Sequence, residues 1–188
     1  MPAMRPKLSE SVLIVVDVQP TFFRPIHDGE AVFRRIQFVV EAARALAVPI
    51  LATEQVPAKM GGTDPRLAAL MPESTKPVAK ACFGCCESPD FQQALARLNR
   101  GQAALVGIET HICVSQTALG LIEQGLQVAF CPDAVGARAL DRHEAGIERM
   151  RAAGVESIHT EALVYEWMGS AEHQAFREVL EIVKRAGP

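Results

Sequence analysis

Three side chains that together make an activated nucleophile follow three predicted strands of this sequence. Asp17 closes the apolar run SVLIVVDVQ, and Lys80 lies at the end of the strand candidate KPVAKACF. Cys113 follows the run AALVGIE and opens an amphipathic segment, VSQTALGLIEQG. The positive end of a helix dipole and a nearby lysine both favour a thiolate. A nearby carboxylate can accept the thiol proton. We therefore interpret the three residues as a candidate catalytic set.

Each of these residues also has an ordinary interpretation that the sequence leaves open. Asp17 is typical of a turn residue that ends a strand, and Lys80 of a solvated surface lysine. Cysteine is among the most buried residue types, so Cys113 is also consistent with a small core residue. The catalytic interpretation depends on the three side chains meeting in space.

The elements that must bring them together alternate between strands and helices. We predict strands at 11–19, 48–55, 76–83, 103–109, 126–135 and 156–160, and helices at 30–47, 88–99, 114–125, 141–154 and 170–187. This alternation predicts right-handed βαβ units and a three-layer α/β/α domain over residues 1–188, with a mainly parallel sheet of about six strands. Ligands bind at the carboxyl ends of such strands, where the three residues lie.

Composition narrows the class of protein. The chain of 188 residues has a formal net charge of −3 and no basic footprint, so we expect no nucleic-acid partner. No apolar run approaches the length of a membrane span, and the N-terminus lacks the apolar region of a signal peptide. Five cysteines, an odd number, favour reduced thiols and a cytoplasmic protein.

Three segments carry a resemblance to a known family. VLIVVDVQPTFF, VAKACFG and GIETHICVSQTALGLIEQGLQVAFCPDAVGAR resemble the isochorismatase-like cysteine hydrolase superfamily. The TEQVP loop and GIETHICV are most similar to its isochorismatase domain-containing hydrolases. The resemblance implies a Rossmann-like sheet and a catalytic triad of Cys113, Asp17 and Lys80.

The resemblance also implies details of the site and its assembly. It implies a cis peptide bond between Ile108 and Glu109, and an oxyanion hole made by the backbone N–H groups of Glu109 and Cys113. Members of this superfamily are commonly oligomeric, so we expect a homo-oligomer. The apolar segment ALVYEWMG is a candidate contact surface, although it is equally consistent with packing under the last helix.

Two departures from relatives narrow the chemistry. Metal-dependent nicotinamidases of the superfamily carry histidine ligands, but the corresponding loop here, ATEQVPAKMGGT, contains no histidine. We therefore expect no metal and no cofactor. True isochorismatases lack the nucleophilic cysteine, so Cys113 favours hydrolysis of a small amide-like substrate at a C–N bond through a covalent intermediate.

Gln19, Phe22, Phe23 and Phe83 are candidates for the walls of a substrate pocket, and the two adjacent phenylalanines are equally consistent with core positions. The thiols of Cys82, Cys85 and Cys86 have no second Cys/His pair at zinc-finger spacing. Two alternatives to a hydrolase remain: a non-catalytic binding or scaffold protein that retains the fold, and a thiol-redox protein. An intact acidic, basic and thiol set disfavours the first alternative, because a buried charged pair is costly to keep.

Overall fold

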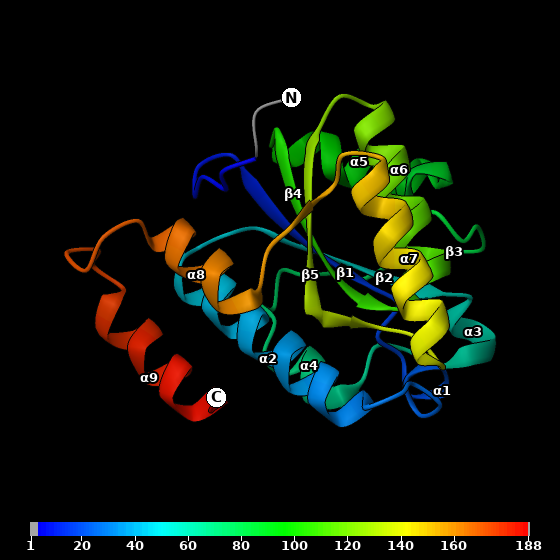
Figure 1. Cartoon of the computed structure of the whole chain (residues 1–188), viewed down its shortest axis with the longest axis horizontal. Coiled ribbons are helices and arrows are strands. Elements are labelled where there is room, and N and C mark those ends of the chain that lie inside the picture. The colour runs from blue at the N-terminus through cyan, green and yellow to red at the C-terminus, as the bar shows by residue number, and fades with distance from the viewer. Residues whose placement is uncertain (1–3, 188) are drawn as a thin grey trace.

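The computed structural model describes residues 4–187 and has one six-stranded sheet at its centre (Figure 1). The strands follow the order β3-β2-β1-β4-β5-β6, and each neighbouring pair is parallel. They are β1 (Ser11–Val16), β2 (Ile50–Gln55), β3 (Val78–Lys80), β4 (Gln102–Ile108), β5 (Gln127–Gly136) and β6 (Glu156–Ser157). The predicted parallel α/β sheet is therefore confirmed.

Helices cover both faces of the sheet, as Figure 1 shows. The longer helices are α2 (Gly29–Ala45), α5 (Pro89–Leu98), α6 (Ser115–Glu123), α7 (Leu140–Ala152), α8 (Thr160–Met168) and α9 (Phe176–Ala186). Alternate residues of β1 point to opposite faces. Leu13 and Val15 pack in the cluster with α2, α8 and α9, whereas Ile14 packs in the cluster with α5, α6 and α7. A strand buried on both faces explains the continuous apolar run in the sequence.

The carboxyl ends of the central strands lie at the same edge of the sheet. Val16 at the end of β1 is level with Gly107 in β4, and Gln55 at the end of β2 is level with Lys80 in β3. The short helices α1 (Pro20–Phe23) and α3 (Pro57–Met60) lie together beside this edge, whereas α4 (Pro65–Ala68) follows α3 along the chain (Figure 1).

The C-terminal region differs from the sequence prediction. The expected helix at 170–187 is shorter in the structure, and a separate helix, α8, precedes it. Trp167 and Met168 of the ALVYEWMG segment are buried in the core cluster that also contains residues of α9, while Tyr165 is exposed. The two largest apolar side chains of this segment are therefore core residues, and the alternative interpretation of packing beneath the last helix holds for them.

Within residues 4–187, no helix combines the length and the apolar character needed to cross a membrane.

Candidate active site

Asp17 and Lys80 form an ion pair at the carboxyl edge of the sheet. The Lys80 Nζ lies 2.7 Å from the Asp17 Oδ2, and both side chains are almost completely buried. Asp17 directly follows β1 and adopts a left-handed backbone conformation with a φ of 52°. Non-glycine residues seldom adopt this conformation, and such strained positions cluster at functional sites. Asp17 is therefore held in a turn that brings its carboxylate against the end of β3.

Strand β2 lies between β1 and β3 and supports both members of the pair. The Thr53 hydroxyl donates a hydrogen bond of 2.8 Å to the Asp17 Oδ1. Lys80 Nζ donates a 2.7 Å hydrogen bond to the Gln55 Oε1, and two longer ones of 3.2 Å to the carbonyls of Cys82 and Phe83. The buried ammonium is thus surrounded by acceptors, which is the condition for burying a charge without a large penalty.

Cys113 lies in an irregular turn between β4 and α6. Glu109 has a φ of 59°, and residues Thr110–Val114 form a π-helical turn (η2) that runs directly into α6. π-helical turns are rare and frequent at functional sites. The Thr117 hydroxyl donates to the Cys113 carbonyl at 2.6 Å and so ties η2 to the first turn of α6. Cys113 is buried, and it lines the same pocket as Asp17.

The expected cis bond between Ile108 and Glu109 is absent. Residues 4–187 contain no cis peptide, so this prediction was wrong. The chain turns here with trans peptide bonds. Glu109 adopts a left-handed conformation, and Gly107, two residues earlier, has a φ of 138°.

Burial raises the pKa of the Cys113 thiol, and the negative charge of Asp17 with its hydrogen bond to the thiol raises it further. The Lys80 ammonium opposes this shift without overcoming it. The lysine and the helix end were expected to favour the thiolate, but burial and Asp17 outweigh the lysine. Burial disfavours the charge on Lys80, but Asp17, Cys85 and Cys113 nearby make the net shift of its pKa upward. Both shifts favour the protonated forms, a thiol at Cys113 and an ammonium at Lys80.

The pocket above the pair has a volume of about 480 Å³. Its lining residues are Asp17, Thr21, Phe22, Pro25, Gln55, Val56, Met60, Phe83, Ile108, Glu109, Ile112, Cys113 and Arg138. Phe22 and Phe83 line it as expected. Gln19 and Phe23 do not, because Gln19 is fully buried among backbone groups and Phe23 packs against Phe33 with ring centroids 5.0 Å apart.

A second ion pair stands on the wall of this pocket. Arg138 Nε lies 2.7 Å from the Glu109 Oε1, and the Glu109 side chain is largely buried whereas Arg138 is partly exposed. The other carboxylate oxygen of Glu109 is buried without a hydrogen-bond partner and lies 3.6 Å from the His111 Nδ1. The pocket thus has apolar walls with one polar side.

Sequence reasoning missed the supporting residues Thr53 and Gln55 and the wall residue Arg138. The signal for the first two was present in the sequence, because Thr53 and Gln55 are polar residues at alternate positions of an otherwise buried strand. Alternate residues of a strand share one face. Arg138 is the last residue of the segment GIETHICVSQTALGLIEQGLQVAFCPDAVGAR, which carries the family resemblance, but its place on the pocket wall was not predicted.

The other cysteines are free thiols, and two of them lie near the site. Cys85 is fully buried, and its thiol donates weakly to the Thr53 hydroxyl at 3.8 Å. Burial raises the pKa of Cys85 to about 11 and that of Cys86 to about 12. Thiols that stay protonated are poor nucleophiles and poor metal ligands. No group of three or more His, Cys, Asp or Glu side chains within residues 4–187 is arranged to hold a metal ion.

We expect the buried thiols to make the protein less stable in alkali. Burial raises the pKa of Cys131 well above the ordinary value of 9.0, so this thiol ionises in the unfolded chain first. The unfolded chain then binds fewer protons than the folded chain, and the free energy of unfolding falls as the pH rises above 9. Between pH 9 and 10 the wild type should lose about 1 kcal/mol more than Cys131→Ala in urea titrations. Equal losses in the two proteins would contradict this assignment.

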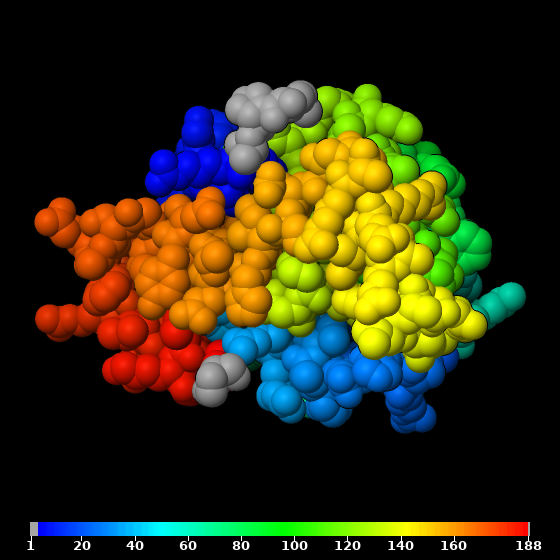
Figure 2. Space-filling model, in the orientation of Figure 1, coloured from blue at the N-terminus to red at the C-terminus, as the bar shows by residue number. Residues whose placement is uncertain are grey.

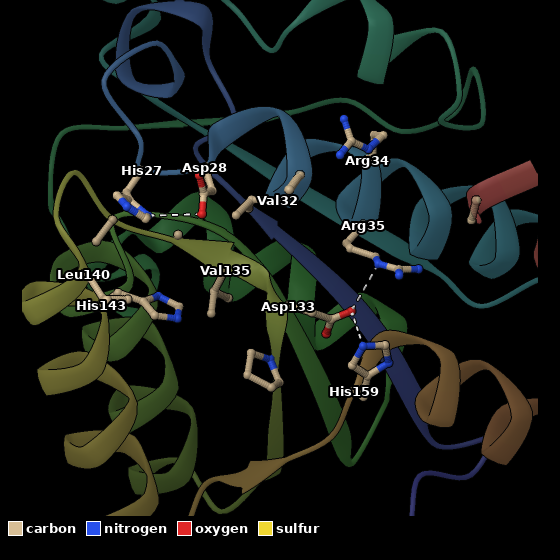
Figure 3. A pocket seen from close by; sticks show the side chains of 15 residues that line it. His27, Asp28, Val32, Arg34, Arg35, Asp133, Val135, Leu140, His143 and His159 are labelled. Atoms are coloured by element: carbon tan, nitrogen blue, oxygen red, sulfur yellow. Dashed lines mark ion pairs between the residues drawn. The ribbon is translucent and has the colours of Figure 1, made fainter. Parts of the chain in front are cut away.

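A second hollow lies between α2, α7 and α8 with β5 at its base (Figure 2). Its volume is about 540 Å³, and three of the five histidines, His27, His143 and His159, line it. Figure 3 shows Asp133 between Arg35 and His159, at 3.9 and 3.2 Å. This groove shares no lining residue with the pocket that contains Cys113, and none of the three candidate catalytic residues lines it.

A parallel α/β sheet with a buried carboxylate–ammonium pair and a pocket cysteine at its carboxyl edge defines a class of hydrolase-like proteins. The sequence profile of the isochorismatase domain matches residues 11–162, and the chain belongs to the isochorismatase family.

Individual relatives cover the whole chain. It is 34% identical to isochorismatase domain-containing protein 2 of Bos taurus over 194 residues, which covers 100% of this chain and 92% of the relative. The solved structure of the MAR1 ribonuclease from Caenorhabditis elegans matches with a TM-score of 0.92 and 31% identity, over 98% of this chain and 95% of that one. The Escherichia coli YcaC gene product, described as an octameric hydrolase of unknown specificity, shares the fold with a TM-score of 0.88 and 19% identity, over 99% and 90% of the two chains.

Proposed function

We propose that this protein is a cysteine hydrolase that cleaves a C–N bond of a small amide-like substrate. The observation that carries the proposal is the buried Asp17–Lys80 pair, of which Asp17 lines the same pocket as Cys113. A buried charged pair is costly to maintain, and a purely structural role is served as well by apolar residues. Its position beside a nucleophile favours chemistry over a scaffold role.

The first step is attack by Cys113 on the carbonyl carbon of the substrate. Because the resting thiol is protonated, Asp17 takes its proton as the sulfur–carbon bond forms. Lys80 stays protonated and stabilises the carboxylate before the transfer and the thiolate character during it. The carbonyl oxygen becomes an oxyanion, which we assign to the backbone N–H groups of Glu109 and Cys113.

The second step expels the nitrogen leaving group. Asp17 returns its proton to the leaving nitrogen as the carbon–nitrogen bond breaks, and a thioester remains on Cys113. A water molecule then gives a proton to Asp17 and attacks the thioester carbon. The carbon–sulfur bond breaks, the acid is released, and the thiol regains its proton.

The shape of the pocket favours a small acyl group. Its walls are mostly apolar, with Phe22, Met60 and Phe83 among them, and a volume of about 480 Å³ suits a compact molecule. The ion pair between Glu109 and Arg138 supplies the polar side.

The name of the Caenorhabditis elegans relative makes RNA a second candidate substrate. The net charge of −3 disfavours it, because phosphate backbones are bound mainly by lysine and arginine. Arg138, the arginine of the pocket wall, already pairs with Glu109. We therefore keep RNA as one arm of the substrate screen.

Labelling with iodoacetamide tests the proposal before any substrate is known. We expect modification of Cys113 at neutral pH, with a rate about tenfold lower in Asp17→Asn. The loss of the proton acceptor should outweigh the lower thiol pKa that follows from removing the carboxylate charge. Cys82, which is more exposed, serves as an internal reference whose rate should not change. Equal rates for Cys113 in both proteins, read by peptide mass spectrometry, would overturn the triad.

A screen of small amides, carbamates, ureas and single-stranded RNA then identifies the substrate class. Cleavage of RNA that persists in Cys113→Ala would exclude the cysteine mechanism, and a failure of all C–N substrates alongside an unreactive Cys113 would favour the scaffold alternative.

We also propose a cytoplasmic homo-oligomer. The octameric Escherichia coli neighbour supports an oligomer. Light scattering at micromolar concentration should give a mass well above that of the 20.3 kDa chain, and a clean monomer would remove the proposal.

A further inference from the structure

We infer that Gln55 is a positioning residue, which holds the Lys80 ammonium toward Asp17 and stabilises its charged form. This inference rests on the proposed function only for its consequence on Cys113. Gln55 and Lys80 are register partners at the ends of β2 and β3, so their side chains lie side by side on one face of the sheet.

The contact is made by the oxygen of the Gln55 amide. Lys80 Nζ donates to the Gln55 Oε1 at 2.7 Å, the same length as its contact with the Asp17 Oδ2. The Gln55 Nε2 donates to the Ala81 carbonyl at 2.8 Å, which fixes the amide so that its oxygen faces the ammonium. Hydrogen bonds to a charged donor are short and strong, and this one favours the charged form of the lysine.

Gln19 holds the backbone of Gln55 from the other side. The Gln19 Oε1 accepts from the Gln55 N–H at 2.6 Å, and the Gln19 Nε2 donates to the Gln55 carbonyl at 3.1 Å. The same Gln19 nitrogen donates to the Gly61 carbonyl at 2.6 Å. Gln19 therefore acts on β2 as a neighbouring strand would, by satisfying both backbone groups of one residue.

Gln55 lines the pocket, but its two polar atoms are already engaged with Lys80 and Ala81. Because both polar atoms of Gln55 already have partners, the side chain positions Lys80 more than it binds substrate. We therefore expect substitutions of Gln55 to change kcat and the titration of Lys80 while KM changes less than about threefold.

The pKa of Lys80 in variants of the full chain is the direct test. Gln55→Met keeps the length of the side chain and removes the acceptor, so the titration midpoint of Lys80 should fall by about one pH unit. Gln55→Glu keeps an acceptor and adds a negative charge, so the midpoint should rise. The measurement is a pH titration of the Lys80 side-chain methylene signals by NMR, with the signal assigned through Lys80→Arg.

Gln93→Met is the matched control, because Gln93 is exposed on α5 and the chemical change is the same. The midpoint of Lys80 should not move in this variant. The rate of Cys113 alkylation at pH 7.5 should fall about tenfold in Gln55→Met and stay unchanged in Gln93→Met.

The outcomes separate this inference from the proposed function. Midpoints that move in opposite directions in Gln55→Met and Gln55→Glu support positioning, because a general loss of packing would not reverse sign. An unchanged midpoint in both variants overturns the inference, even where Cys113 reacts selectively and the triad stands. If Gln55→Met fails to fold, the nearly isosteric Gln55→Glu alone decides, and a midpoint that does not rise overturns the inference.

Discussion

Replacing Cys113 with alanine is expected to lower kcat by about 10⁴-fold or more on any substrate that the screen identifies. The substitution removes the sulfur that forms the covalent bond, and the remaining pocket can only bind. Asp17→Asn should lower kcat nearly as far, because the amide cannot take the thiol proton. Its near-isosteric side chain leaves the contact with Thr53 available.

The double variant of Cys113 and Asp17 separates one catalytic unit from two independent contributions. Residues that act as a unit give effects that are far from additive, so the double variant should be no slower than the worse single variant by more than a few-fold. A loss of kcat in the double variant that equals the product of the two single losses would instead show that the residues act independently.

Cys131→Ala controls for the loss of a thiol at a distance. Cys131 is fully buried in β5 and lies outside the pocket. The kcat of the Cys131→Ala variant should therefore stay within about twofold of the wild type, although the variant is less stable. Saturating kinetics of purified, folded variants decide the comparison. A Cys113→Ala protein that keeps most of its turnover would return Cys113 to the role of a small core residue.

The sheet was predictable because its strands are buried on both faces. A parallel strand that packs against helices above and below reads as a continuous apolar run, and SVLIVVDVQ and AALVGIE are such runs. The position of Asp17 and Lys80 at one edge followed from this alone, since parallel strands place their carboxyl ends together.

Details that depend on packing between distant segments were not predictable. The local sequence of β4 and η2 does not reveal whether the chain reverses through a cis bond or through a left-handed Glu109. The pKa of Cys113 depends on how deeply the turn is buried and on the orientation of Asp17, neither of which the local sequence reveals. Gln19 was a candidate for the pocket wall, whereas its side chain bonds to backbone groups of Gln55 and Gly61, which lie 36 and 42 residues away.

The helix α8 was missed although its period is present in the sequence. Its buried residues, Thr160, Leu163, Val164, Trp167 and Met168, lie at helical spacing, and Glu161, Ala162 and Tyr165 between them are exposed. The segment ALVYEWMG was interpreted only as an apolar contact or packing segment, so this period was not used. The start of α8 is marked by Asp133, which accepts from the Thr160 N–H at 3.0 Å across 27 residues.

Gly107→Ala is expected to cause the largest loss of stability of any single methyl addition near the site. Gly107 has a φ of 138°, which side chains of L-residues rarely adopt, and an added Cβ would lie 2.3 Å from the Val16 carbonyl oxygen and 2.8 Å from its nitrogen. Both atoms belong to the backbone of the neighbouring strand, so no rotamer change relieves the clash. β1 and β4 would have to separate at the residue that precedes Asp17. We expect the free energy of unfolding to fall by about 4 kcal/mol or more.

Gly101→Ala is the matched control for this loss. Gly101 directly precedes β4, the strand that contains Gly107, and its φ is not in the left-handed region. The nearest atom to an added Cβ is the Glu10 Oε2 at 3.7 Å, which is an ordinary van der Waals contact. Urea unfolding should place this variant within about 0.5 kcal/mol of the wild type. A Gly107→Ala protein of near wild-type stability would mean that β1 and β4 are not held this closely. In the structure, the close contact between Val16 and Gly107 fixes the point at which the chain leaves β1 and turns toward the pocket. Without that contact, only Thr53 and Lys80 would hold Asp17 in position.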